Sequence, residues 1–297
     1  MKASKTVSLV LGSGGARGYA HIGVIEELER CGYEIVSISG SSMGTLVGAL
    51  YASGRMQEFK EWVMELDGPD LAEWLDVSWN IRSGVFRGTK VMQKLAAMIG
   101  DRKIEELPIK YTAVATDLNR NKEVWFQEGD LLDAVRASIA IPAILTPVEM
   151  KGMLLVDGGV LNPLPVAPTM SDHTDMTIAV NLYADLPKPD IPVPDSVSDR
   201  ESGFVKALGG VLHKAQDAFF KENERGLPVF EVLEKTLDSV QRTLISYHLG
   251  NYPPDVLINI SKDVCGTFDF HKAFQTIEAG RMAAREVLSA LSTDPLR

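Results

Sequence analysis

Residues 6–52 contain the sequence TVSLVLGSGGARGYAHIGVIEELERCGYEIVSISGSSMGTLVGALYA, in which strand and helix patterns alternate. Residues 6–11 are a short apolar run with β-branched side chains that ends at a glycine, which is typical of a buried strand. Residues 18–30 carry apolar side chains at helical spacing, with glutamates on the other faces. The same two patterns recur at 34–38 and 43–52. This alternation, with short turns, predicts a parallel sheet that helices cover on both faces.

The rest of the chain continues the mixed pattern. Further strands are expected at residues 109–116, 123–126, 153–156, 177–182 and 256–260, and further helices at 130–138, 204–220, 229–247 and 271–291. Residues 184–203 hold four prolines and several acids, so a loop or lid is expected there. We therefore expect an α/β fold in one domain over residues 1–297: a core with the motifs at about 5–183, a loop and helical excursion at about 184–250, and a closing strand and helix at 254–292.

Composition limits the class of protein and its partners. The 297 residues are 45% hydrophobic and 24% charged, so a sizeable core can be buried and wholesale disorder is excluded. The formal net charge of −10 argues against a nucleic-acid partner, which needs a basic surface. It also gives no long-range attraction to anionic lipid, so a transient contact with a membrane surface would have to be local and apolar.

The two cysteines, Cys31 and Cys265, lie far apart and beside apolar stretches, so we expect small packed side chains rather than a disulfide or a metal site. No metal or other cofactor is expected. The apolar run near the N-terminus is too short for a signal peptide, and no stretch is long enough to span a bilayer. We therefore expect a cytoplasmic protein.

A glycine-rich loop, GSGGARG at residues 12–18, joins the first expected strand to the first helix. Its glycines allow a sharp turn and expose backbone N–H groups at a helix N-terminus, and such a loop holds either a phosphate or a developing oxyanion. A dinucleotide-binding fingerprint would have glycine in place of Arg17, and a P-loop would end in Gly-Lys-Ser or Gly-Lys-Thr. Taken alone, the loop leaves a nucleotide site open as an alternative.

A second motif, GSSMG at residues 40–44, lies between an expected strand and an expected helix. This is the G-x-S-x-G pattern of a nucleophile elbow, in which a tight turn exposes the hydroxyl of the central serine, Ser42. The alternative is that Ser41 or Ser42 merely caps an ordinary helix.

A third motif, Asp157-Gly158-Gly159, follows an expected strand. Alone, this tripeptide is most often a β-turn. The three motifs together favour chemistry, because acyl transfer needs a nucleophile, a base and an oxyanion site at one place. Each motif follows a strand, and the carboxyl ends of parallel strands form one edge of a sheet. We therefore expect the motifs to meet at that edge.

The motifs, in this order and spacing, resemble those of the patatin-like phospholipase family. The resemblance rests on GGARG at 14–18, GSSMG at 40–44, ASIAIP at 137–142 and DGG at 157–159. It covers roughly residues 5–183, and residues 277–285 resemble the closing helix of bacterial members. One departure is Ser13, where many plant and animal members carry glycine and bacterial members often carry serine. The resemblance implies a three-layer fold with a mostly parallel central sheet flanked by helices.

The resemblance also implies roles for individual residues. Ser42 would be the nucleophile and Asp157 the general base of a Ser-Asp dyad. The backbone N–H groups of Gly14 and Gly15, with that of Met43 as a further donor, would stabilise the oxyanion. Two roles stay open for Arg17, which either binds a lipid phosphate or pins the loop to an acidic neighbour. The supporting motif residues are Gly12, Arg17, Gly18, Gly40, Gly44, Gly158 and Gly159.

A histidine is not obligatory for this chemistry, because burial raises the pKa of an aspartate and makes it a better base. Of the five histidines, His21 shares a helix face with apolar residues and is expected to be packed. The other four follow Asp157 but lie in no strand-end motif, so the Ser-Asp-His triad of an α/β-hydrolase is discounted.

The expected activity is hydrolysis of carboxylic esters of lipids, of the phospholipase A type, through an acyl-enzyme on Ser42. One alternative is a thioesterase or acyltransferase, since the same dyad serves both; another is a non-enzymatic regulatory protein that keeps the fold. The helices expected at 204–220 and 229–247 are either core elements or a cap for an acyl chain. Chain length, head group and oligomeric state are left open by the sequence.

Overall fold

The computed structural model describes residues 5–66, 89–142, 144–195, 197 and 229–293. Its strands are β1 Lys5–Leu11, β2 Tyr33–Ser41, β3 Lys110–Asp117, β4 Lys122–Phe126, β5 Val148–Met150, β6 Met153–Asp157, β7 Met176–Ala184 and β8 Val256–Ser261. Its α-helices are α1 Ala20–Arg30, α2 Met43–Ala52, α3 Met56–Glu65, α5 Thr89–Ile99, α6 Leu131–Ser138, α8 Val229–Asn251 and α9 Ala273–Thr293. Short 3-10 helices are η1 Gly15–Tyr19, η2 Ile104–Glu106, η3 Gly158–Val160, η4 Ala167–Thr169 and η5 Phe270–Lys272.

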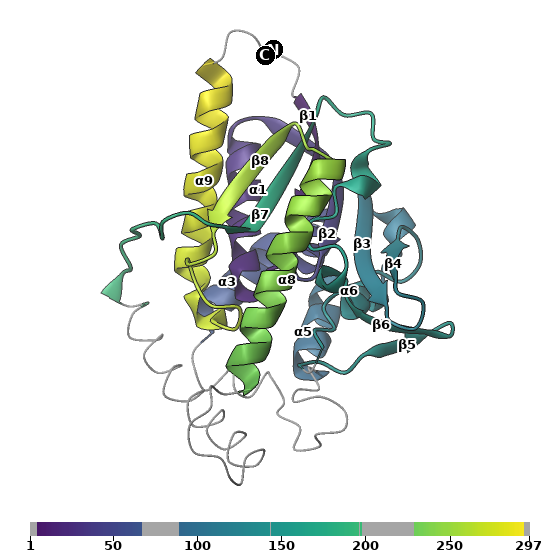
Figure 1. The fold of residues 1–297 in the computed structure, drawn as a ribbon. Helices are drawn as coiled ribbons and strands as arrows, with labels where there is room; N and C mark the ends of the chain where they lie inside the picture. The colour runs from purple at the N-terminus through teal and green to yellow at the C-terminus, as the bar shows by residue number, and fades with distance from the viewer. Residues whose placement is uncertain (1–4, 67–88, 143, 196, 198–228, 294–297) are drawn as a thin grey trace, which may run out of the picture.

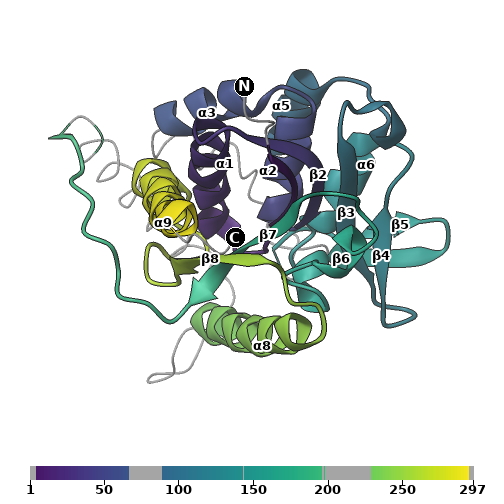
Figure 2. The same ribbon diagram turned by 90° about the horizontal axis from the view of Figure 1, so that it is seen from above.

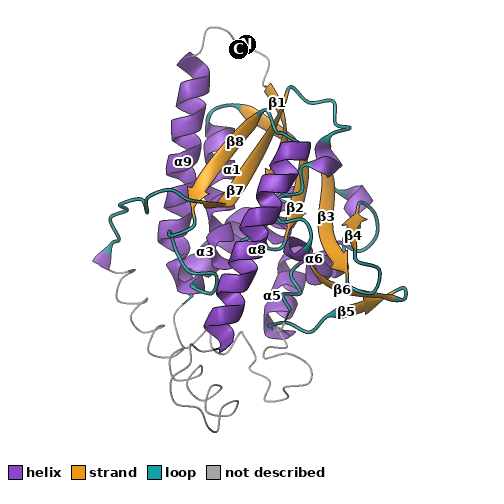
Figure 3. Cartoon of the chain, in the orientation of Figure 1, coloured by secondary structure: helices purple, strands orange, loops and turns teal. Residues whose placement is uncertain are grey.

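The described strands form one eight-stranded sheet in the order β5-β6-β3-β2-β1-β7-β8, with β4 also paired to β3 (Figures 1 and 3). The central pairs β3-β2, β2-β1, β1-β7 and β7-β8 are all parallel. Helices α1, α2 and α9 lie on one face and α8 on the other (Figure 2). The central strand β1 is buried from Val7 to Leu11, as expected for a strand covered on both faces. The expected α/β architecture is confirmed, and β8 joins the sheet beside β7.

The expectation that all three motifs follow parallel strands is wrong for Asp157. Strand β6 runs antiparallel to β3, and Asp157 pairs with Ala115. Val114, the residue before Ala115 in β3, pairs on the other side of β3 with Ser41, the last residue of β2. Strands β6 and β2 run in opposite directions on the two sides of β3, and they end beside adjacent residues of β3. The motifs still meet, because β3 extends beyond β2 and lets an antiparallel strand enter from the opposite direction.

Other expectations are corrected locally. The helix expected from residue 18 begins as the 3-10 helix η1, and α1 starts at Ala20, because the glycine-rich loop uses the tighter turn. Cys265 is buried as expected, but Cys31 is exposed, because it follows the last residue of α1 at the surface. The helix expected at 204–220 lies outside the described residues. Among the helices that the structure describes, none has the length and apolar character of a bilayer span.

Candidate active site

Ser42 occupies a strained turn between β2 and α2. Its backbone has φ 55° and ψ −124°, a conformation that costs free energy in a residue with a side chain. The carbonyl of Ser42 accepts the first helical hydrogen bond, from the N–H of Leu46 at 3.2 Å. The geometry matches that of a nucleophile elbow, in which a sharp strand-to-helix turn presents the serine hydroxyl.

The elbow depends on close backbone approach at Gly44. A Cβ atom added there would lie 2.1 Å from the carbonyl oxygen of Leu11, at the end of β1. Only glycine therefore allows the first turn of α2 to pack directly against the sheet at the start of the glycine-rich loop.

The side chains of Ser42 and Asp157 meet. The hydroxyl of Ser42 donates to Oδ2 of Asp157 at 2.5 Å, and the N–H of Gly159 donates to Oδ1 at 2.8 Å. Ser42 and Asp157 are each only 3% exposed. Burial raises the pKa of the Asp157 carboxyl to about 7, and this effect outweighs the opposing hydrogen bonds from Ser42 and Gly159.

The glycine-rich loop lies beside this pair. Gly15 has φ 55°, and an added Cβ atom would lie 2.3 Å from the carbonyl oxygen of Thr267, so glycine is required. Within the described part of the chain, the N–H groups of Gly14, Gly15 and Met43 have no hydrogen-bond acceptor. The other motif glycines are all buried, and they are Gly12, Gly18, Gly40, Gly158 and Gly159.

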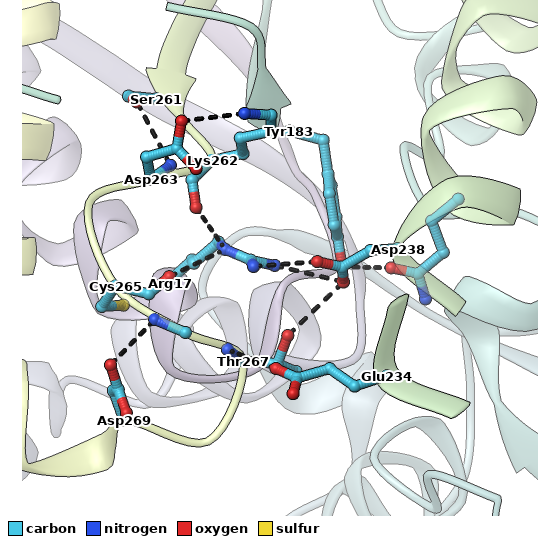
Figure 4. Close-up of polar contacts among 12 residues, drawn as sticks. Arg17, Tyr183, Glu234, Asp238, Ser261, Lys262, Asp263, Cys265, Thr267 and Asp269 are labelled. Carbon is cyan, nitrogen blue, oxygen red and sulfur yellow. Dashed lines mark hydrogen bonds and ion pairs between the residues drawn. The ribbon is translucent and has the colours of Figure 1, made fainter. Parts of the chain in front are cut away.

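Arg17 connects several segments of the chain that surround it (Figure 4). Its Nε donates to the carbonyls of Lys262 at 2.9 Å and Cys265 at 3.1 Å, while its terminal nitrogens donate to the carboxylate of Asp238 at 3.3 and 2.9 Å. The guanidinium also lies 5.2 Å from the centre of the Tyr183 ring. Of the two roles left open for Arg17, these contacts are those of a loop pinned to an acidic neighbour.

Helix α8 covers Ser42 and Asp157. A cavity of about 30 Å³ adjoins Ser42 and Asp157, and α8 contributes Glu234, Leu237, Asp238 and Gln241 to its wall. The remaining wall includes the apolar side chains of Ile141, Pro142, Val160 and Phe268. A larger groove of about 590 Å³ lies between α8 and strands β7 and β8, but neither dyad residue lines it. The hydroxyl of Ser42 and the carboxyl of Asp157 meet at the smaller cavity.

Polar contacts hold α8 in place over the site. Gln241 Oε1 accepts hydrogen bonds from the hydroxyls of Tyr183 and Ser13. Glu234 accepts the N–H of Thr267 at 3.2 Å (Figure 4). Together with the ion pair between Asp238 and Arg17, these hydrogen bonds connect three successive turns of α8 to the glycine-rich loop, to β7 and to the segment that contains Thr267.

Neither His21 nor His248 forms a hydrogen bond with Ser42 or Asp157. His21 Nε2 donates to the carbonyl of Gly12 at 2.8 Å, and burial lowers its pKa to about 4, so its ring is neutral at pH 7. His248 Nε2 lies 3.0 Å from the carbonyl oxygen of Leu161. The expectation that His21 is a packed side chain is confirmed. Across the described ranges, no group of three or more His, Cys, Asp or Glu side chains is placed to hold a metal ion.

Sequence reasoning missed the part of the site that α8 supplies. Glu234, Asp238 and Gln241 recur at i, i+4 and i+7, which identifies one polar face of a helix but not what that face contacts. Tyr183 had a weak signal, because it lies near the carboxyl end of a parallel strand, where functional groups gather.

Comparisons with known proteins give matches in sequence and in structure. A sequence model described as patatin-like phospholipase matches residues 9–170. An uncharacterized NTE family protein of Mycobacterium tuberculosis (strain ATCC 25618 / H37Rv) is 38% identical over 337 residues, which cover 98% of this chain and 93% of that protein. Patatin-like phospholipase domain-containing protein 6 of Homo sapiens is 34% identical over 184 residues, which cover 60% of this chain and 13% of that protein. The crystal structure of VipD from Legionella pneumophila has a TM-score of 0.47 at 14% identity and covers 97% of this chain and 67% of that chain.

Proposed function

Because the chain belongs to the patatin-like phospholipase family, we propose that it is a lipid acyl-hydrolase that cleaves carboxylic esters with Ser42 and Asp157 as its catalytic dyad. One observation carries this proposal: the Ser42 hydroxyl donates to the Asp157 carboxylate at 2.5 Å between two buried side chains. Such a contact gives the hydroxyl proton an acceptor that is already in place.

In the acylation step, Ser42 Oγ attacks the acyl carbonyl carbon of the ester and its proton passes to Asp157 Oδ2. The carbonyl oxygen becomes an oxyanion, which the N–H groups of Gly14 and Gly15, and that of Met43, are available to stabilise. Collapse of the tetrahedral intermediate breaks the ester C–O bond, and the proton on Asp157 passes to the leaving alcohol. The acyl group is then bound to Ser42.

Deacylation reverses the roles of the reacting groups. Asp157 accepts a proton from a water molecule, whose oxygen attacks the acyl-enzyme carbonyl; Ser42 leaves with that proton, and the carboxylic acid is released. A pKa of about 7 for Asp157 suits both directions of transfer, because the group can accept and return a proton near neutral pH.

The lining of the cavity supports an acyl substrate. Ile141, Pro142, Val160, Leu237 and Phe268 offer apolar contact beside the dyad. The charge of Arg17, which lies within the glycine-rich loop, is already paired with Asp238. The site therefore favours recognition of the apolar acyl part of a lipid, presented from a transient contact with a lipid surface.

Reaction with a fluorophosphonate and hydrolysis of matched esters and thioesters test the proposal. Ser42→Ala is expected to abolish both, whereas Ser41→Ala is the matched control. Ser41 is fully buried beside Ser42, and its hydroxyl has no hydrogen-bond partner among the described residues. Labelling that survives in Ser42→Ala, or is lost equally in Ser41→Ala, would refute the assignment of the nucleophile. Hydrolysis of the thioesters but not of the esters would show that the substrates are acyl-thioesters rather than carboxylic esters.

A further inference from the structure

Ser138, the last residue of α6, makes three hydrogen bonds at the elbow. Its hydroxyl lies 2.6 Å from the carbonyl oxygen of Val114, 3.1 Å from the nitrogen of Ser42 and 2.7 Å from Oγ1 of Thr45. The carbonyl can only accept, so the single proton of Ser138 goes to Val114, and Thr45 and the N–H of Ser42 must both donate to it. The side chain is fully buried and its hydrogen-bonding capacity is fully used.

The same segment also holds the second residue of the dyad. Two residues after Ser138, the carbonyl of Ala140 accepts the N–H of Asp157 at 2.9 Å. The last residue of α6 and the residue two positions after it therefore bind the backbone N–H groups of Ser42 and Asp157, respectively.

The sheet by itself does not fix the distance between the two dyad residues. Ser42 follows β2 and Asp157 ends β6, and β3 lies between these strands. The last β2 pair joins Ser41 to Val114, so the N–H of Ser42 is just beyond the ladder. Ser42 also has a positive φ that needs support from its surroundings. The Ser138 hydroxyl supplies an acceptor at this point.

We propose that Ser138 is a positioning residue, whose hydroxyl holds the backbone of Ser42 so that the nucleophile stays within hydrogen-bonding distance of Asp157. The inference rests on the proposed function, because it concerns the same dyad. Ser138 itself takes no part in bond making. Its role predicts an effect on the rate of the chemical step rather than on substrate binding.

Ser138→Ala tests this role. Loss of the acceptor is expected to lower kcat by about a hundredfold, the order expected for a misplacement of 1 Å, with KM nearly unchanged. Fluorophosphonate labelling should slow in parallel. The pH profile provides a second readout: the hydrogen bond from Ser42 lowers the pKa of Asp157, so weakening it should move the inflection of kcat/KM to higher pH. A purely structural serine would affect the melting temperature but not this inflection.

Two further variants of Ser138 bracket the result. Ser138→Thr keeps the hydroxyl and is expected to restore most of the rate. In Ser138→Cys the side chain is similar in size, but its sulfur is a weak hydrogen-bond acceptor. This variant is therefore expected to have a low kcat, and it provides the test if Ser138→Ala does not fold. Ser53→Ala is the matched control, because Ser53 is a buried serine that bonds the carbonyl of Leu50 at the far end of α2, and it should keep the wild-type kcat.

The outcomes separate this inference from the proposed function. If the wild type is labelled and turns over esters, but Ser138→Ala or Ser138→Cys matches its kcat and pH inflection, the positioning role is overturned. If Ser53→Ala loses as much activity as Ser138→Ala, the effect belongs to packing and the inference also fails. If wild type itself shows no labelling, the proposed function fails first.

Discussion

Replacing Asp157 by asparagine is expected to make the protein more stable at neutral pH while it removes the proposed base. The carboxyl of Asp157 is buried, and burial raises its pKa from 3.8 to about 7. In the unfolded chain the same carboxyl ionises at its ordinary pKa. Folding at neutral pH therefore opposes the ionisation of a group that water would readily ionise, and asparagine avoids this cost.

The magnitude follows from the two pKa values. They differ by about three pH units, and each unit corresponds to about 1.4 kcal/mol, so the full cost is about 4 kcal/mol. Below pH 3.8 both states are protonated and the cost is absent. It grows as the pH rises from the unfolded pKa to the folded pKa, and it is constant above that range. Between pH 5 and pH 8 the stability advantage of Asp157→Asn should increase by about 2–3 kcal/mol.

Denaturant unfolding of the two proteins at pH 5 and pH 8 measures this difference. Asp117→Asn is the opposite control, because the hydrogen bond from Arg120 holds the pKa of Asp117 below its usual value. That variant should lose stability, and the loss should persist at neutral pH. An advantage of Asp157→Asn that is absent, or equal at both pH values, would refute the claim that the Asp157 carboxylate is held at a cost.

Three further predictions follow from the same geometry. The value of kcat/KM should rise about tenfold per pH unit below pH 7 and level off above it, because Asp157 must be ionised to accept a proton; a flat profile from pH 5 would contradict the assigned base. Asp238→Asn leaves the buried guanidinium of Arg17 without its counter-charge and should lower the free energy of unfolding by about 1–3 kcal/mol in denaturant titrations, whereas unchanged stability would show that the pair does not hold α8. Gly44→Ala should prevent α2 from packing on β1 and abolish the cooperative unfolding transition in denaturant titrations. Gly250→Ala in α8 is the control, because an added Cβ there meets no atom within 4 Å, and its unfolding midpoint should be at least as high as that of the wild type. A well-folded Gly44→Ala protein would contradict the close approach at Gly44.

Local sequence was sufficient for much of the architecture. The apolar run of β1 and the helical spacing of α1 are patterns that extend over a few residues, so they predicted elements close to those observed. The motifs also identified Ser42 and Asp157 as candidates, because a nucleophile elbow and a strand-end aspartate have short, readable signatures. These signals are local because backbone sterics and amphipathic burial are local.

Only the tertiary structure decided how these parts meet. The direction of β6, the contacts of Ser138 and Ala140 with the dyad, and the pairing of Arg17 with Asp238 join segments between about 20 and 220 residues apart in the chain. A single residue type is compatible with many partners at such separations, and the choice among them is made by packing the whole sheet and its helices together. The pKa of Asp157 belongs to this second class, because burial in the assembled fold raises it and no neighbour in the sequence does.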